Sequence, residues 1–132
     1  MKAKQILSTY VHVLDDGRSV AVPVSDSFWA DLARGKHAEL NQGRLMTAFT
    51  FSQPWPNWER HPAGEELVLL LTGEATLTLQ LEDGEKDIVL DTPGAYVLVP
   101  PNTWHTAKTK VTTTMLFLTP GAGTDHRPVK AE

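Results

Sequence analysis

The sequence contains no cysteine, and it also lacks long apolar runs and an excess of positive charge. Without cysteine, disulfides and thiolate metal sites are excluded, so a bound metal ion needs imidazole and oxygen ligands. Apolar runs such as Leu67–Leu71 are too short to span a bilayer, and the pair Ile6–Leu7 is too short for a signal-peptide core. The 12 basic residues face 16 acidic ones, giving a formal net charge of −4. We therefore expect a cytoplasmic protein that binds neither membrane nor nucleic acid.

Helical periodicity is confined to the segment Ser25–Gly35, where Phe28, Trp29 and Leu32 recur at helical spacing and Gly35 ends the helix. The chain then continues as short β-type runs separated by Pro, Gly and Asn. These runs are expected at residues 45–51, 58–61, 66–72, 75–81, 86–90, 95–99, 103–107 and 111–118. Short strands at such even spacing predict an all-β protein with a closed or sandwiched antiparallel sheet.

A chain of 132 residues is long enough for one such domain and short for two. We interpret residues 1–132 as a single domain. It would consist of an N-terminal arm with a short helix (1–42), a barrel (43–119) and a C-terminal tail (120–132). The tail is rich in turn-forming residues and has no apolar periodicity, so we expect it to become ordered only by lying on another part of the protein.

Four residues form a candidate metal site. Glu59 and His61 are two positions apart, so on a strand their side chains leave the same face and can share one ion. The turn at residues 62–64 returns the chain, and Glu66 then opens the next strand beside them. His105 arrives from far along the sequence, just after a Pro-Pro-Asn turn.

The spacing Glu59-x-His61-x4-Glu66-x6-Gly73, followed by Gly94-x5-Pro100-x-Asn102-x2-His105, resembles the two motifs of the cupins. The resemblance implies an antiparallel jelly-roll β-barrel, a homodimer, and one metal ion held by the four residues of the candidate site. Glu59 stands where the commoner motif has histidine. Its role as a ligand therefore assumes that a carboxylate replaces an imidazole. Asn102 replaces a glycine, as its tolerance of positive φ allows. Thr109 stands at the place of a closing asparagine.

Two imidazoles and two carboxylates suit Fe(II), Mn(II), Ni(II) or Zn(II), and the sequence does not choose among them. Four protein ligands leave two positions of an octahedral ion for water, dioxygen or a bidentate substrate. We favour a metal-dependent dioxygenase, isomerase or lyase acting on a small oxygen-rich organic molecule. The alternatives are a non-catalytic barrel that binds a small molecule as a sensor or carrier, and a barrel with a vestigial site that serves association.

Several neighbouring residues have competing interpretations. Glu65 is the alternative to Glu66 as a ligand, although alternation directs Glu65 away from the interior if Glu66 points inward. Alternation also directs Arg60 outward. Aromatic residues that belong either to the core or to a substrate cavity are Trp104, Tyr96 and Phe117. Histidines without partners at ligand spacing, interpreted as surface residues, are His12, His37 and His126. Aromatic residues beside a proline turn, expected to be exposed enough for a subunit contact, are Trp55 and Trp58.

Overall fold

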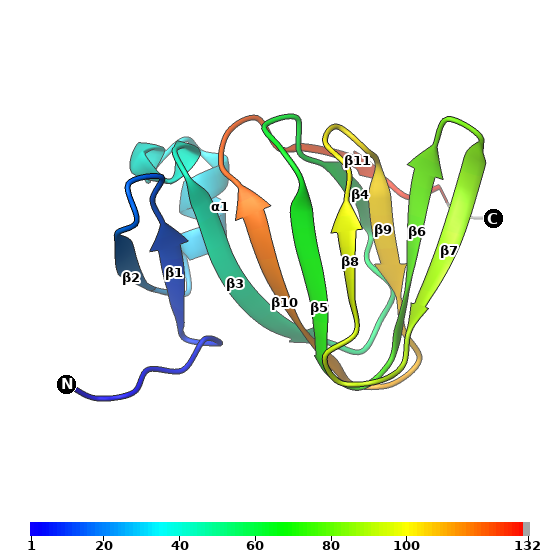
Figure 1. Cartoon of the computed structure of the whole chain (residues 1–132), viewed down its shortest axis with the longest axis horizontal. Helices are drawn as coiled ribbons and strands as arrows, with labels where there is room; N and C mark the ends of the chain where they lie inside the picture. The colour runs from blue at the N-terminus through cyan, green and yellow to red at the C-terminus, as the bar shows by residue number, and fades with distance from the viewer. Residues whose placement is uncertain (131–132) are drawn as a thin grey trace.

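Eleven strands form two antiparallel sheets in the computed structural model, which describes residues 1–130 (Figure 1). The order of the first sheet is β2 (Ser19–Pro23), β1 (Thr9–Val13), β3 (Arg44–Phe51), β10 (Thr113–Pro120), β5 (Glu66–Thr72) and β8 (Tyr96–Val99). The order of the second sheet is β11 (Asp125–Pro128), β4 (Asn57–Arg60), β9 (His105–Lys108), β6 (Ala75–Leu81) and β7 (Gly84–Leu90). The predicted all-β jelly roll is confirmed.

The two sheets are held together by side chains and not by a continuous hydrogen-bond ladder. Within residues 1–130, no strand of one sheet pairs with a strand of the other, so of the two predicted forms, closed or sandwiched, the jelly roll is the sandwiched one. Alternation along β5 and β6 explains the arrangement, because Val68, Leu70 and Leu77 point inward and have no exposed surface. Their side chains form one apolar cluster with those of β7, β8 and β10.

The N-terminal segment adds a hairpin that the sequence pattern did not predict. β1 pairs with β2 and also with β3, which extends the six-stranded sheet. His12 lies on the buried face of β1 with 4% exposure, and its Nε2 atom is 2.6 Å from the carbonyl oxygen of Gln42. The interpretation of His12 as a surface residue was therefore wrong. A buried polar residue in the strand also weakened the apolar alternation by which the strand could have been recognised.

The expected helix is present but shorter, as α1 (Phe28–Ala33), and a 3-10 turn, η1 (Ala38–Asn41), follows it. Phe28 anchors α1, because its ring is 1% exposed and meets the ring of Tyr10 edge-on at 5.5 Å. Gly35 follows the helix with a φ of +80°, as its role as a terminator requires. Among residues 1–130, no helix has the length and apolar character needed to cross a membrane.

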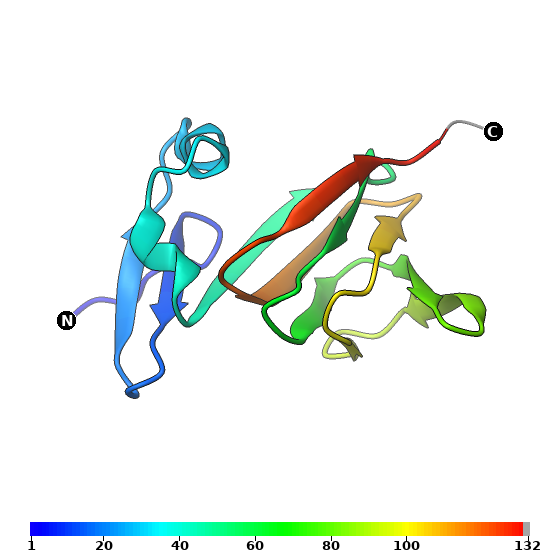
Figure 2. The same cartoon turned by 90° about the horizontal axis from the view of Figure 1, so that it is seen from above.

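The C-terminal tail forms the edge strand of the second sheet. β11 pairs with β4 from Asp125 opposite Arg60 to Pro128 opposite Asn57 (Figure 2). Every residue of β11 is exposed, so apolar burial does not hold it in place. Its order comes from backbone pairing with β4, in agreement with the expectation that the tail needs another segment to lie on.

Candidate metal centre

Three polar side chains form a row across the inner face of the second sheet. In the antiparallel pairing, Glu59 on β4 is opposite His105 on β9 and also opposite His126 on β11. Residues opposite one another on neighbouring strands point to the same face of the sheet. Segments separated by dozens of residues in the sequence are thereby brought to one place.

The loop between the sheets adds His61 and Glu66 to this row. His61 follows β4 directly, and Glu66 is the first residue of β5. The backbone N–H of Asn102, a residue with a φ of +56°, donates to the carbonyl oxygen of His61 at 3.0 Å and so ties the two motifs together. Glu66 is 2% exposed, whereas Glu65 points to solvent. The structure therefore places Glu66, and not Glu65, in the candidate site.

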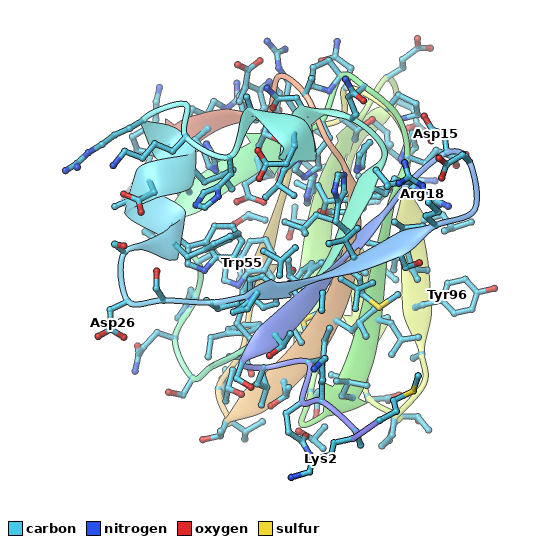
Figure 3. All side chains as sticks on the ribbon, turned by 90° about the vertical axis from the view of Figure 1, so that its left-hand side faces the viewer. Lys2, Asp15, Arg18, Asp26, Trp55 and Tyr96 are labelled. Atoms are coloured by element: carbon cyan, nitrogen blue, oxygen red, sulfur yellow. The ribbon has the colours of Figure 1, made fainter. Side chains whose placement is uncertain are left out.

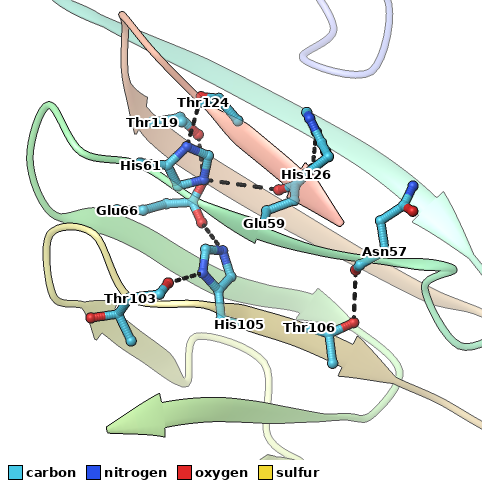
Figure 4. Close-up of polar contacts among 10 residues, drawn as sticks. All are labelled: Asn57, Glu59, His61, Glu66, Thr103, His105, Thr106, Thr119, Thr124 and His126. Carbon is cyan, nitrogen blue, oxygen red and sulfur yellow. Dashed lines mark hydrogen bonds and ion pairs between the residues drawn. The ribbon is translucent and has the colours of Figure 1, made fainter. Parts of the chain in front are cut away.

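The four predicted residues come together (Figure 4). The Nε2 atom of His105 is 3.0 Å from Oε1 of Glu66, and the Nε2 atom of His61 is 3.1 Å from Oε2 of Glu66. Glu59 is more distant, with Oε2 at 3.9 Å from Nε2 of His61. One ligand atom each from Glu59, His61 and His105 lies within 4.8 Å of the other two, a spacing that fits one shared ion.

The remaining ring nitrogens fix the direction of the two imidazoles. Nδ1 of His105 is 2.9 Å from the carbonyl oxygen of Thr103, which can only accept, so Nδ1 carries the proton. In the neutral ring, Nε2 of His105 then directs a lone pair toward the carboxylate of Glu66. Nδ1 of His61 has its own partner, Oγ1 of Thr124, at 2.9 Å. Such contacts orient imidazoles that bind metals.

Within residues 1–130, three buried atoms of the site have no hydrogen-bond partner: Nε2 of His61, Nε2 of His105 and Oε1 of Glu66. Buried polar atoms are almost always satisfied, so three converging exceptions require an explanation. In the neutral rings these atoms are electron-rich, and either a proton or a metal ion between them relieves their repulsion. A divalent metal ion would satisfy all three at once, so the residues fit the metal that the sequence motifs imply.

In the metal-free site, the buried carboxylate of Glu66 requires a compensating positive charge. Burial raises the pKa of a carboxyl group, but contacts with His105 and His61 outweigh it and lower the pKa of Glu66 to about 2. Burial lowers the pKa of His105, but Glu66 outweighs this effect and raises it. Glu66 therefore stays ionised, and in the absence of metal a proton on His105 supplies the compensating charge.

Contacts to the ligand atoms also come from residues that the sequence patterns did not identify. Oγ1 of Thr119 donates to Oε2 of Glu66 at 2.6 Å. His126 is exposed, as predicted, but its Nε2 atom lies 3.1 Å from Oε1 of Glu59, a partner that sequence spacing did not indicate. The hydrogen bond to Glu59 raises the pKa of His126. Thr119 and His126 come after the second motif, and neither has a spacing from it that indicates a role in the site. The one sequence feature that could have pointed to His126 is its place in a tail that was expected to lie on another segment.

The outer face of the second sheet holds residues with no access to the site. Arg60 points outward as predicted, with its guanidinium carbon 4.6 Å from the ring centre of Trp104 and Nε 2.8 Å from Asp125. The guanidinium of Arg127 lies over the same ring at 4.4 Å. Trp104 is half-buried between these two cations, so it belongs neither to the core nor to a cavity.

A cavity of about 740 Å³ opens beside the candidate site, and Glu59, His61 and Glu66 form part of its wall. Phe117 is buried in the apolar cluster and also lines this cavity, so it belongs to the core and to the cavity wall. Tyr96 does not, because it is 59% exposed and projects away from the molecule (Figure 3).

Trp55 and Trp58 have different surroundings. Trp55 packs against the apolar cluster, with its ring 5.6 Å from that of Phe117, which corrects the expectation that it is exposed for a subunit contact (Figure 3). Trp58 is half-buried, and the guanidinium of Arg127 lies 5.8 Å from its ring. His37 is also half-buried, against the ring of Phe28.

Solved structures similar to this chain show what the fold is. No family model and no curated protein matches the sequence. Hydroquinone 1,2-dioxygenase from Sphingomonas sp. TTNP3 matches 60% of this chain with 19% identity and a TM-score of 0.50. An oxalate oxidase in complex with glycolate matches 62% with 15% identity and a TM-score of 0.54. A cupin superfamily protein from Desulfitobacterium hafniense matches 58% with 28% identity and a TM-score of 0.49.

The matched region spans 60%, 45% and 65% of those three chains, less than two thirds of each. At identities of 19% and 15%, the likeness to the hydroquinone dioxygenase and the oxalate oxidase concerns the fold alone. The chain therefore has the jelly-roll fold of the cupin type.

The pH dependence of stability follows from the buried Glu66–His105 pair. Glu66 has a lowered pKa, so its contribution is present above its ordinary value of 4.5 and is lost as the pH falls toward 2. His105 has a raised pKa, so its contribution is present below 6.5 and is lost as the pH rises through the raised value. We expect the metal-free protein to be most stable between these limits, as measured by thermal unfolding in a chelating buffer. Glu66→Gln should flatten both slopes, and unchanged slopes in that variant would contradict the assignment.

Proposed function

We propose that this protein binds one divalent transition metal ion through His61, His105, Glu66 and Glu59, and that it acts on a small oxygen-bearing organic molecule held beside the ion. Three converging, buried and unsatisfied atoms carry this proposal, two of them on residues that line an open cavity, His61 and Glu66. The donor set suits Fe(II), Mn(II), Ni(II) or Zn(II). Two carboxylates balance the charge of a divalent ion, which favours retention of the ion in a buried site.

The roles of the residues follow from their contacts. A bound ion would supply Lewis-acid polarisation of the oxygen atoms that it holds, or electron transfer if it is redox-active. Thr124 and Thr103 hold the two imidazoles, and Thr119 holds one oxygen of Glu66. His126 holds Oε1 of Glu59, so that Oε2 is free to face the ion. The cavity would admit the organic molecule to the positions that the protein leaves open.

Metal content tests the site directly. We expect about one transition metal ion per chain in untagged protein, because these donors are preorganised in the folded state. His61→Ala and His105→Ala should each lower the affinity for zinc by at least about 100-fold in competition with a chelator, since each removes a ligand. His37→Asn is the matched control, because it changes a histidine away from the cavity and asparagine tolerates its φ of +59°. Absence of metal from the wild type, even after reconstitution, would overturn the proposal.

A non-catalytic binding protein is the second candidate. Among the described residues that line the cavity, His126 is the one titratable side chain outside the proposed ligand set. A site with so few free acids and bases is also suited to holding a ligand without converting it.

Turnover separates these two functions. We expect the metal-loaded protein to consume a member of a panel of diketones, hydroxy acids and phenols, assayed by mass spectrometry with and without dioxygen. His105→Ala should abolish that consumption. Ligands that bind the loaded protein and are recovered unchanged in every condition would favour the binding protein.

We further propose that a second copy of this chain covers the outer face of the six-stranded sheet. Tyr96 and Leu98 on β8 are 59% and 54% exposed. Leu67 is opposite Leu98, and Leu69 is opposite Tyr96, so these side chains form one outward apolar surface. The outward positions of β5, β8 and β10 carry no charged residue. Large exposed apolar patches mark interfaces. Two copies of this face can pack against each other without burying an unpaired charge.

We expect a dimer by size-exclusion chromatography with light scattering. Leu98→Lys should produce a monomer, because the new charge would be buried in the interface without a partner. Val89→Lys is the control, since Val89 is similarly exposed at 56% but lies on β7, at the edge of the other sheet. A wild-type monomer at micromolar concentration would contradict this part of the proposal.

A further inference from the structure

The cavity beside the candidate metal site is lined by two chemically different groups of residues. The polar group contains Glu59, His61 and Glu66, together with threonine hydroxyl groups. The other group consists of apolar side chains, among them Trp29 and Phe49. A ligand that fills the cavity must therefore carry both oxygen atoms and an apolar body.

The apolar part of the lining contains three aromatic rings, those of Trp29, Phe49 and Phe117, beside aliphatic side chains. The rings of Phe49 and Phe117 stack at 4.6 Å with an interplanar angle of 17°. Trp29 meets Phe49 edge-on at 6.4 Å and 87°. Ring faces and edges in such an arrangement attract a further ring more specifically than aliphatic walls do.

Trp29 is the unusual member of this group because it is 48% exposed although it lines the cavity. It lies on α1, and contacts with Phe28 at 5.2 Å and Tyr10 at 5.8 Å hold its ring in place. An indole ring that is fixed and still open to solvent is available for stacking with a ligand.

Charge limits the ligand further. Among the described lining residues there is no lysine and no arginine, and the ionisable side chains are Glu59, Glu66, His61 and His126. An anionic group of a ligand would therefore find its counter-charge at the metal ion. A second carboxylate, or a phosphate group remote from the ion, would lie against apolar side chains without compensation.

We infer that the cavity takes a planar aromatic molecule with a single pair of metal-chelating oxygen atoms, its ring held by Trp29 and Phe49. The inference rests on the proposed function, because the chelating oxygens need the metal ion. A volume of about 740 Å³ is in the range of sites for ring-sized ligands. A two-carbon hydroxy acid bound at the ion has no ring with which to contact Trp29 and Phe49.

Two ligands with the same oxygen atoms test the inference: salicylate, and 2-hydroxycyclohexanecarboxylate, whose ring is saturated. Binding of each to the zinc-loaded protein is measured by calorimetry, after the zinc content has been determined. We expect Trp29→Leu and Phe49→Leu each to weaken the binding of salicylate about tenfold. The same variants should weaken the binding of the saturated analogue less than about twofold, because leucine keeps the apolar contact and removes the aromatic one. Trp29→Phe should retain most of the affinity for salicylate.

Val89→Ala is the control, because Val89 is exposed on β7 and belongs neither to the cavity lining nor to the proposed subunit interface. It should change neither affinity. If the wild type binds zinc but both leucine variants affect the two ligands equally, the inference is overturned and the metal site stands. If the wild type binds no zinc, the proposed function fails and the inference fails with it.

Discussion

The carboxylate of Glu66, buried between two imidazoles, is the interaction on which this structure depends. An ionised group with 2% exposure is costly unless an opposite charge and hydrogen bonds compensate it. The compensation comes from three directions: His61 on the preceding loop, His105 on the opposite sheet and Thr119 at the end of β10. A metal ion shared by these groups would serve the same purpose more completely than a proton, because it would also satisfy the unpaired ring nitrogens.

This arrangement explains why the interior of the sandwich is apolar in one part and polar in another. Leucine, valine and phenylalanine side chains fill the space between the sheets around Leu70 and Leu77. Polar groups then concentrate where β4, β9 and β11 meet the start of β5. The cavity lies at this transition, so a ligand there would contact both environments.

Segments outside the two motifs give the cavity its particular character. α1 near the N-terminus supplies Trp29, and the C-terminal strand β11 supplies His126. The motif residues form the proposed metal site, which proteins with different reactions could share. Selectivity for one class of ligand must come from the walls, where residues of α1 and β11 join those of β3 and β10.

The sequence by itself determined the strands with strong alternation and the local groups of the site. β6 appears at the predicted residues because its alternating apolar side chains have one way to be buried in a sandwich, and β5 appears as the continuous apolar run between turn residues that predicted it. Glu59 and His61 were predicted to act together, because positions two apart share a strand face.

Only the tertiary structure decided the rest. β1, β2 and β11 are stabilised by pairing with distant strands, and β2 and β11 bury little, so their own residues carry almost no periodic signal. The choice of Glu66 over Glu65, and the contact of His126 with Glu59, depend on how two sheets face each other and how a terminal strand is added at an edge. Such contacts join residues at no fixed spacing in the chain, so their proximity exists only once the sheets have formed.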